Sequence, residues 1–225
     1  MLSLILATVT LTSISIYLLY DASDKRVKEI EHEKLEESLF TLKTNVSVAK
    51  KVLQTYYLEY QKARQEQTTA PEELEKMYQQ KAKDAIRVLR FEADDGYFWI
   101  QDNTPTMLMH PDRPELESKS LIDNQDANGK YHNREIAQKV LKEGKGIVHY
   151  AYVKPKTHQV SPKVAYFELF EPWGWTIATG ILIEHIQEKV NHEKEKLYMS
   201  IQALIIKNLI DWRLCRCDFF LIDMV

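Results

Sequence analysis

The feature that most restricts how this chain can fold is an uncharged run at its start. Residues 2–20, LSLILATVTLTSISIYLLY, contain no charged side chain. As a helix rising about 1.5 Å per residue, they would span roughly 28 Å, close to the hydrocarbon thickness of a bilayer. The alternative is a cleaved signal peptide, but no Lys or Arg precedes the run and no small-residue cleavage site follows it. We therefore predict a transmembrane anchor at residues 2–20.

A long helix is predicted directly after the anchor, over residues 21–65, which are charge-rich and lack both Pro and Gly. Their apolar side chains recur with steps of four and three, the seven-residue repeat of a coiled coil or of a helix lying on a partner. This seam consists of Leu35, Leu39, Leu42, Val46, Ala49, Leu53, Tyr56 and Tyr60. Two interpretations stay open, and both can hold for different faces of the helix: packing on the chain's own domain, and a homodimer along the Leu35–Tyr60 seam.

The remainder predicts an α+β domain built on an antiparallel, five-stranded sheet. A second helix is expected over residues 71–90, because Pro71 is favourable in a first helical turn and acidic residues follow it. Alternating aromatic and β-branched residues predict a sheet region spanning residues 96–183, interrupted by a helix over 131–143. The expected strands cover 96–102, 106–111, 146–153, 163–170 and 175–183.

Composition and motifs exclude several classes of function. The net charge of −3 gives no tendency to bind nucleic acid. The histidines show no close ligand spacing, so we expect no metal site. We find no nucleophile–base motif or phosphate loop, so we expect neither enzymatic activity nor a bound cofactor. Cys215 and Cys217 are the only cysteines, which leaves residues 21–196 without a disulfide.

One run has the spacing of a calcium loop. Asn124, Asp126, Asn128, Gly129 and Glu135 occupy positions 1, 3, 5, 6 and 12 of an EF-hand-like pattern. Position 1 is Asn rather than Asp, however, and no helix-like segment precedes the run. We therefore interpret it as a turn leading into the helix at 131–143.

Three motifs together resemble a known family. In order, GYFWIQDNTPTMLMHP, the loop ending DANGKY, and PKVAYFELFEPWGWTIATGILI are similar to the single-Cache, PAS-like input domains of bacterial chemoreceptors and sensor histidine kinases. The resemblance covers roughly residues 25–190. It implies an extracytoplasmic sensor, anchored by residues 2–20 in the cell membrane, that binds a small carboxylate such as pyruvate, propionate, acetate or lactate.

Candidate ligand-binding residues follow from the resemblance and from what a carboxylate requires: a cation or N–H donors on one side and an apolar wall on the other. We select Trp99, His110 and Lys163 first, then Tyr97, Tyr166 and Arg90. The aromatic residues could instead fill the core, Lys163 could end a solvated strand, and Arg90 could form a structural ion pair with Glu92 or Asp94.

The end of the chain departs from the family pattern. Residues 191–225 are expected to form a return helix and an atypical tail, a truncated or degraded second span, because charges interrupt the apolar stretch after residue 206. The prediction is therefore a single-pass sensor domain (residues 21–190) without its own output module. The alternative function is a membrane-anchored structural or protein-interaction module that binds no small molecule. A pocket lined by Trp99 and Lys163 would favour the sensor, and a filled core the alternative.

Overall fold

A computed structural model describes residues 2–66, 70–92, 96–155 and 157–222. The chain divides into two compact units. Unit 1 comprises residues 1–35 and 187–225, and unit 2 comprises residues 36–186. The helices α1 (Leu2–Glu66) and α4 (Ile183–Ile222) each contribute residues to both units.

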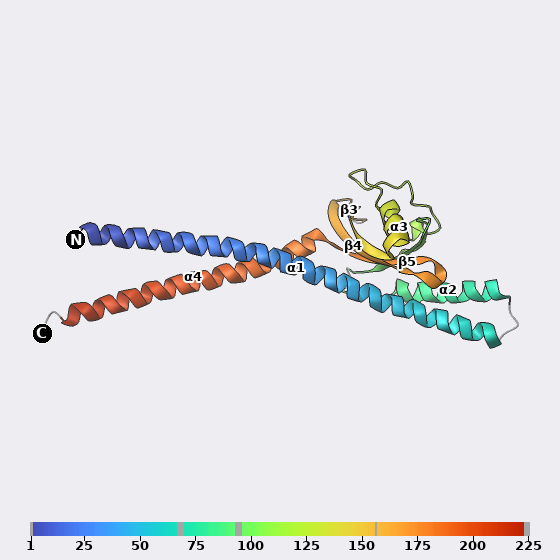
Figure 1. The fold of residues 1–225 in the computed structure, drawn as a ribbon, viewed down its shortest axis with the longest axis horizontal. Coiled ribbons are helices and arrows are strands. Elements are labelled where there is room, and N and C mark those ends of the chain that lie inside the picture. The colour runs from blue at the N-terminus through green and yellow to red at the C-terminus, as the bar shows by residue number, and fades with distance from the viewer. Residues whose placement is uncertain (1, 67–69, 93–95, 156, 223–225) are drawn as a thin grey trace. The chain divides into compact units, whose positions relative to one another are not determined.

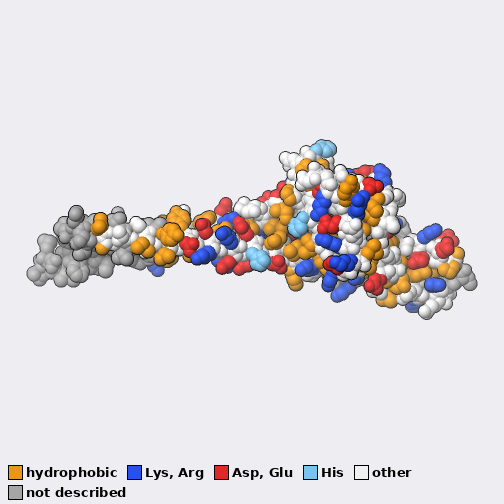
Figure 2. All heavy atoms as spheres, turned by 45° about the horizontal axis from the view of Figure 1, so that its top comes forward, with side chains coloured by type: hydrophobic (Ala, Val, Ile, Leu, Met, Phe, Trp, Pro, Cys, Tyr) orange, Lys and Arg blue, Asp and Glu red, His pale blue; other side chains and the backbone are white. Residues whose placement is uncertain are grey.

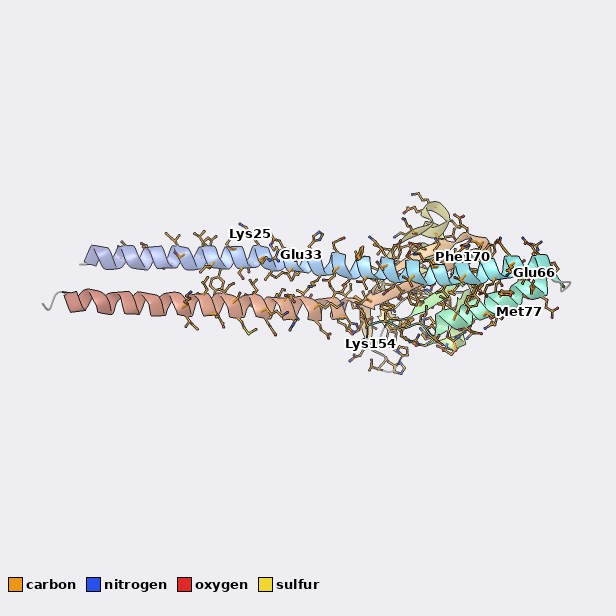
Figure 3. The ribbon with its side chains drawn as sticks, turned by 90° about the horizontal axis from the view of Figure 1, so that it is seen from below. Lys25, Glu33, Glu66, Met77, Lys154 and Phe170 are labelled. Atoms are coloured by element: carbon orange, nitrogen blue, oxygen red, sulfur yellow. The ribbon has the colours of Figure 1, made fainter. Side chains whose placement is uncertain are left out.

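Unit 1 contains the start of α1 and most of α4. Ile30 of α1 and Val190 of α4 are buried, and the Nζ atom of Lys194 lies 2.8 Å from a carboxylate oxygen of Glu31. The exposed surface of α1 carries ion pairs along the helix, including Arg26 with Glu33. Glu33 is labelled on this helix in Figure 3. Helix α4 corresponds to the predicted return helix. The side chains of residues 208–225, which include both cysteines, are outside the described part of the structure.

The predicted anchor at residues 2–20 is helical. Across the described residues, however, no helix is both long enough and apolar enough to cross a membrane, so a membrane span is not shown.

Unit 2 contains the predicted antiparallel sheet (Figure 1). Its spatial order is β2-β1-β5-β4-β3, and every neighbouring pair is antiparallel. The strands are β1 (Phe98–Asp102), β2 (Met107–Met109), β3 (Lys145–Val153), β4 (Val160–Phe170) and β5 (Trp175–Leu182). Between the last two lies the 3-10 turn η2 (Glu171–Trp173). The predicted fold class is confirmed.

One face of the sheet packs against α1 and α2 (Pro71–Arg87), which lie on the same side in Figures 1 and 3. The rings of Tyr57 and Phe170 meet edge to face with centroids 6.1 Å apart. Tyr60 of α1 clusters with Leu74 of α2. Within the predicted seam, five side chains are at most 5% exposed: Leu42, Val46, Ala49, Leu53 and Tyr60. The chain's own domain therefore covers this part of the seam, and dimerisation along α1 is not shown.

The other face carries α3 (His132–Glu143), which ends at Gly144 with φ +70°, a left-handed conformation that glycine adopts without strain. Ile136 and Val140 of α3 pack with Val148 and Phe167 of the sheet. Each such fully buried aliphatic or aromatic side chain contributes roughly 1.5–3 kcal/mol to folding. This core fills the sheet face beneath α3 and leaves the end of the sheet around Lys163 available for a site.

Strand β4 begins at Val160, three residues earlier than the sequence pattern predicts. The sequence pattern assigns Pro162 to the turn before the strand, because proline lacks the N–H that a central strand needs. Here Pro162 pairs only with Ala151 of β3, because the pairing of β4 with β5 starts at Lys163. The proline therefore lies where β4 is still an edge on one side.

Candidate ligand-binding site

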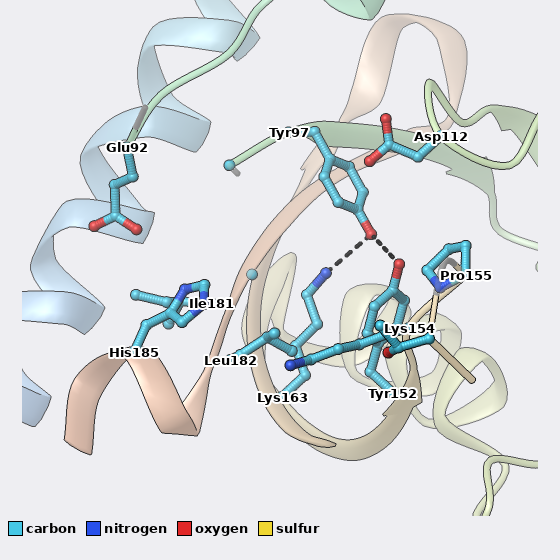
Figure 4. A pocket seen from close by; sticks show the side chains of 13 residues that line it. Glu92, Tyr97, Asp112, Tyr152, Lys154, Pro155, Lys163, Ile181, Leu182 and His185 are labelled. Carbon is cyan, nitrogen blue, oxygen red and sulfur yellow. Dashed lines mark hydrogen bonds between the residues drawn. The ribbon is translucent and has the colours of Figure 1, made fainter. Parts of the chain in front are cut away.

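A buried lysine lies at the centre of the candidate site (Figure 4). Lys163 is 3% exposed, and its Nζ atom lies 3.0 Å from the hydroxyl oxygen of Tyr97. The same atom lies 4.4 Å from the ring centroids of Tyr97 and Tyr152 and 5.5 Å from that of Trp99. Aromatic faces attract a cation at such distances, so three rings form a cage around the amine.

Strand register places the cage. Lys163 is paired with Tyr150 of β3 and with Leu182 of β5. Gly180, two residues before Leu182, leaves space for the lysine stem, because a Cβ atom at Gly180 would come within 3.0 Å of Lys163 Cε. The hydroxyl groups of Tyr97 and Tyr152 are 3.3 Å apart, so a hydrogen-bonded chain connects Lys163, Tyr97 and Tyr152.

His110 adds a neutral ring beside the cage. Its centroid lies 5.1 Å from that of Tyr97, and its Nδ1 atom accepts the backbone N–H of Arg113 at 3.0 Å. Burial, with the nearby charges of Lys163 and Arg113, lowers the pKa of His110 to about 3. The ring is therefore neutral at physiological pH, and its remaining proton lies on Nε2, which is then a donor.

His110 is also held by its backbone. Its N–H donates to a carboxylate oxygen of Glu117 at 2.9 Å. Glu117 in turn binds both terminal nitrogens of Arg87 on α2, at 2.6 and 3.1 Å. A bidentate pair of this kind fixes orientation as well as position. Helix α2 therefore determines where the ring of His110 lies.

Two cavities meet at this cage. The larger, of about 640 Å³, is lined by Lys163, Tyr97 and Tyr152, with Asp112, Lys154 and His185 among the polar side chains around it (Figure 4). The smaller, of about 330 Å³, is lined by Trp99, His110 and Tyr152, with residues of the 113–127 segment and of α3. Tyr152 lines both. Trp99 lines the smaller of these two cavities and Lys163 the larger.

Among the residues that the structure describes, no ion pair includes the amine of Lys163, whose hydrogen-bond partner is the Tyr97 hydroxyl. Burial lowers the pKa of Lys163 to about 7, and the more distant charge of Asp112 opposes this shift. Removing an ammonium group from water without a counter-ion is costly. The cage is therefore suited to receive an anion from outside the chain.

The structure brings four of the six predicted residues together: Tyr97, Trp99, His110 and Lys163. Tyr166 lies on the opposite face of the sheet, where its hydroxyl donates to Glu168 at 2.7 Å. Arg90 lines neither cavity. It donates to Asp112 at 3.0 Å, an ion pair of the kind the sequence suggested but with a different acid. Tyr166 and Arg90 are therefore left out of the candidate site.

Tyr152, Gly180 and Asp112 are site residues that the sequence did not indicate. Tyr152 and Gly180 join the site through strand register, which the sequence pattern does not reveal. Asp112 lies in the segment after β2, in the same polar stretch as His110. Its proximity to His110 in the sequence was the one available signal for it.

The calcium-like run has a structural role. Asp126 accepts the backbone N–H groups of Asn128 and Lys130 with one oxygen and that of Ala151 with the other. Glu135 instead pairs with Lys130 and Lys139. No group of three metal-ligating side chains forms within the described part of the chain. Asp126 thus fastens the loop over the smaller cavity to the edge strand β3.

Comparison with known proteins agrees with this fold. The Cache domain family model matches residues 19–209. The chain belongs to the Cache domain family. It is 37% identical over 109 residues to the methyl-accepting chemotaxis protein McpP of Pseudomonas putida, covering 48% of this chain and 20% of McpP. It is 27% identical over 94 residues to the sensor histidine kinase MctS of Rhizobium johnstonii, covering 41% and 20%. The matches thus span about a fifth of these relatives.

Solved Cache structures show the same architecture. A periplasmic sensor domain of a chemotaxis protein superposes with a TM-score of 0.59 at 29% identity, covering 66% of this chain and 97% of that one. A Cache chemosensory domain described for carboxylic acid recognition gives a TM-score of 0.56 at 29% identity, covering 69% and 97%. The Cache chain is thus similar to sensor domains of chemoreceptors and histidine kinases.

Proposed function

We propose that this Cache chain is the periplasmic ligand-binding input of a membrane-bound chemoreceptor or sensor kinase, and that its ligand is a small monocarboxylate. The observation that carries the proposal is the buried Lys163 amine, which has three aromatic rings around it and, among the described residues, no acid in a salt bridge with it. A carboxylate supplies the missing charge, and the rings of Trp99 and Tyr97 provide an apolar wall for a short carbon chain.

The surroundings favour an anion. His110 offers an Nε2–H donor near the cage, and the hydroxyl groups of Tyr97 and Tyr152 can rotate to donate. On the face shown in Figure 2, acidic and basic side chains are interspersed rather than gathered into a patch of one sign. Recognition is therefore expected to depend on the buried amine and not on a charged surface.

Ligand size limits the expected affinity. Acids such as pyruvate have about six non-hydrogen atoms, and the best small ligands gain about −1.5 kcal/mol per atom. Binding is then at most roughly −9 kcal/mol, or a Kd around the micromolar level at the tightest. Such a ligand changes the equilibrium between two states only through its different affinity for each, which would be transmitted through α1 and α4.

The test is calorimetry and thermal shift with the full chain in mild detergent, using acetate, propionate, pyruvate and lactate up to millimolar concentration. We expect at least one acid to bind to the parent and Lys163→Ala to lose that binding. The matched control is Lys50→Ala, which removes an amine from the opposite face of the sheet. No stabilisation by any of the four acids would exclude the carboxylate, and unchanged binding by Lys163→Ala would exclude the site.

A further inference from the structure

Within the described part of the chain, no salt bridge supplies a counter-ion for the charge buried at Lys163. The hydrogen-bond partner of the Nζ atom is an uncharged phenol, the hydroxyl of Tyr97 at 3.0 Å. Asp112 is the acid that acts on Lys163 from a distance, but it is already paired with Arg90 at 3.0 Å. An empty cage therefore lowers the pKa of the Lys163 amine, and a carboxylate held in the cage would raise it.

The groups facing Lys163 from the other elements are a mixture of neutral rings and compensated charges. The residue just before β1 is Tyr97, the segment after β2 contributes His110, Asp112 and Arg113, and β3 contributes Tyr150 and Tyr152. Burial raises the pKa of Tyr97 well above its usual value, and His110 stays neutral because its pKa is low.

Charged side chains also line the wider cavity. Lys154 is paired there with Glu184, which also accepts the hydroxyl of Ser161. Glu92 and His185 lie on the same wall (Figure 4). His185 is therefore the ionisable neighbour that an experiment must separate from Lys163.

We propose that this site binds a carboxylate together with a proton, so that the chain responds jointly to carboxylate concentration and to acidity. The proposal rests on the carboxylate function proposed above. Where the amine of the empty site is neutral, it takes one proton from solvent as the carboxylate enters, which gives an ammonium–carboxylate pair enclosed by Tyr97, Tyr152 and Trp99. Before binding, the hydroxyl of Tyr97 can donate to the neutral nitrogen, so both states are hydrogen-bonded.

The proton uptake falls in the physiological range, because burial brings the pKa of Lys163 to about 7. Below that pH the amine is already charged, and the affinity should not change with pH. Above it, each further pH unit removes tenfold of the charged form, and the apparent affinity should fall by about tenfold per unit. Carboxylic acids of this class remain ionised throughout, since their pKa values lie near 4.

The experiment is calorimetry of the full chain with propionate and with pyruvate at pH 6, 7, 8 and 9, in pairs of buffers that differ in heat of ionisation. We expect a constant Kd between pH 6 and 7, a rise of about tenfold per unit above it, and an uptake that approaches one proton per ligand. His185→Asn should keep this slope. Lys163→Arg, if it binds, should lose it because guanidinium stays charged.

A second measurement does not depend on that variant folding or binding. In a chain with isotope-labelled lysine side chains, the Lys163 resonance should titrate near pH 7 when the site is empty and at clearly higher pH with saturating propionate. A Kd that is constant from pH 6 to 9, or an empty-site titration above pH 9, would overturn the proton coupling and leave the proposed function standing. Absence of binding at pH 6 would instead overturn the proposed function.

Discussion

The charged side chains on the two faces of strand β4 differ in their partners. Towards α1, Glu168 accepts from Lys50 at 3.3 Å and from the hydroxyl of Tyr166 at 2.7 Å, so its charge is matched within the chain. Towards α3, Lys163 lies among three aromatic rings, one of which is the phenol of Tyr97, and the described residues place no acid in a salt bridge with it. The two side chains lie on one strand, five residues apart, so alternation places them on opposite faces. The comparison shows that a missing internal partner, rather than burial or charge alone, distinguishes the candidate site.

The largest expected effect tests the cost of that missing partner. We expect Lys163→Met to stabilise the ligand-free chain at pH 7, by up to several kcal/mol, because it replaces an unpaired amine with an apolar chain of similar length. In the unfolded chain a lysine titrates near pH 10.5, whereas in the folded chain Lys163 titrates near 7. The unfolded state thus binds more protons between these values, and the parent should gain up to about 1.4 kcal/mol of stability per pH unit there.

Urea unfolding at pH 7, 8, 9 and 10 measures this effect. The slope with pH should be present in the parent and absent in Lys163→Met. The matched variant is Lys50→Met on the other face, where the lysine is 38% exposed and paired with Glu168. It should lose about 1 kcal/mol or less and keep the slope. If Lys163→Met is less stable than the parent at pH 7, the amine already has a partner in the folded chain.

Next in size is the effect of adding a methyl group beside the lysine. In Gly180→Ala, the new Cβ would lie 2.7 Å from the backbone oxygen of Val164 and 3.0 Å from Lys163 Cε. We expect a loss of about 1–3 kcal/mol in unfolding free energy, since strands β4 and β5 must separate slightly. Ligand affinity should fall at least tenfold as well, because the lysine stem is displaced from the cage.

Gly146→Ala is the control for that variant. Its Cβ would come within 2.8 Å of the ring of Phe167, a similar crowding in the core beneath α3. The stability loss should be comparable, and the ligand affinity should remain within about twofold of the parent. Calorimetry and urea unfolding of both variants separate the two effects. Equal losses of affinity would mean that general loosening of the sheet, and not displacement of Lys163, weakens binding.

A smaller effect is expected at the loop over the smaller cavity. Burial alone would raise the pKa of Asp126, but hydrogen bonds from Ala151, Lys130 and Asn128 lower it by more. The folded carboxyl therefore contributes stability above its ordinary pKa near 3.8, and this is lost as the pH falls below that value. Asp126→Asn should cost about 1–3 kcal/mol, because an amide cannot accept all three N–H groups.

Hydrogen exchange localises this loss. The amides of Ala151, Asn128 and Lys130 should exchange faster in Asp126→Asn, and ligand affinity should fall several-fold because the loop lines the cavity. Asp123→Asn is a suitable control, since Asp123 is 83% exposed and pairs only across the surface with Arg134. Asp123→Asn should change neither the amide exchange rates nor the ligand affinity measurably. Unchanged exchange at Ala151 would contradict the fastening role of Asp126.

The sequence predicted the sheet, its strands and the long helices because alternation and helical spacing are local signals. It also predicted Tyr97, Trp99, His110 and Lys163, which the structure brings together. It failed where the answer depends on which strands become neighbours. Tyr152 and Gly180 reach Lys163 only through register, and the seam of α1 could not be assigned to a dimer or to the chain's own sheet until the sheet was placed.

Tyr166 tests most directly the assignment of residues to one face of the sheet. Its substitution has the smallest expected effect. It follows Lys163 by three positions, and an odd separation in a strand places two side chains on opposite faces. Tyr166→Phe removes one hydrogen bond, to Glu168, and should cost about 1 kcal/mol of stability. Ligand affinity should stay within about twofold of the parent, measured by the same calorimetry as for Lys163→Ala. A loss of affinity as large as that of Lys163→Ala would mean that the ligand contacts the α1 face, and that the distinction between the two faces of β4 is wrong.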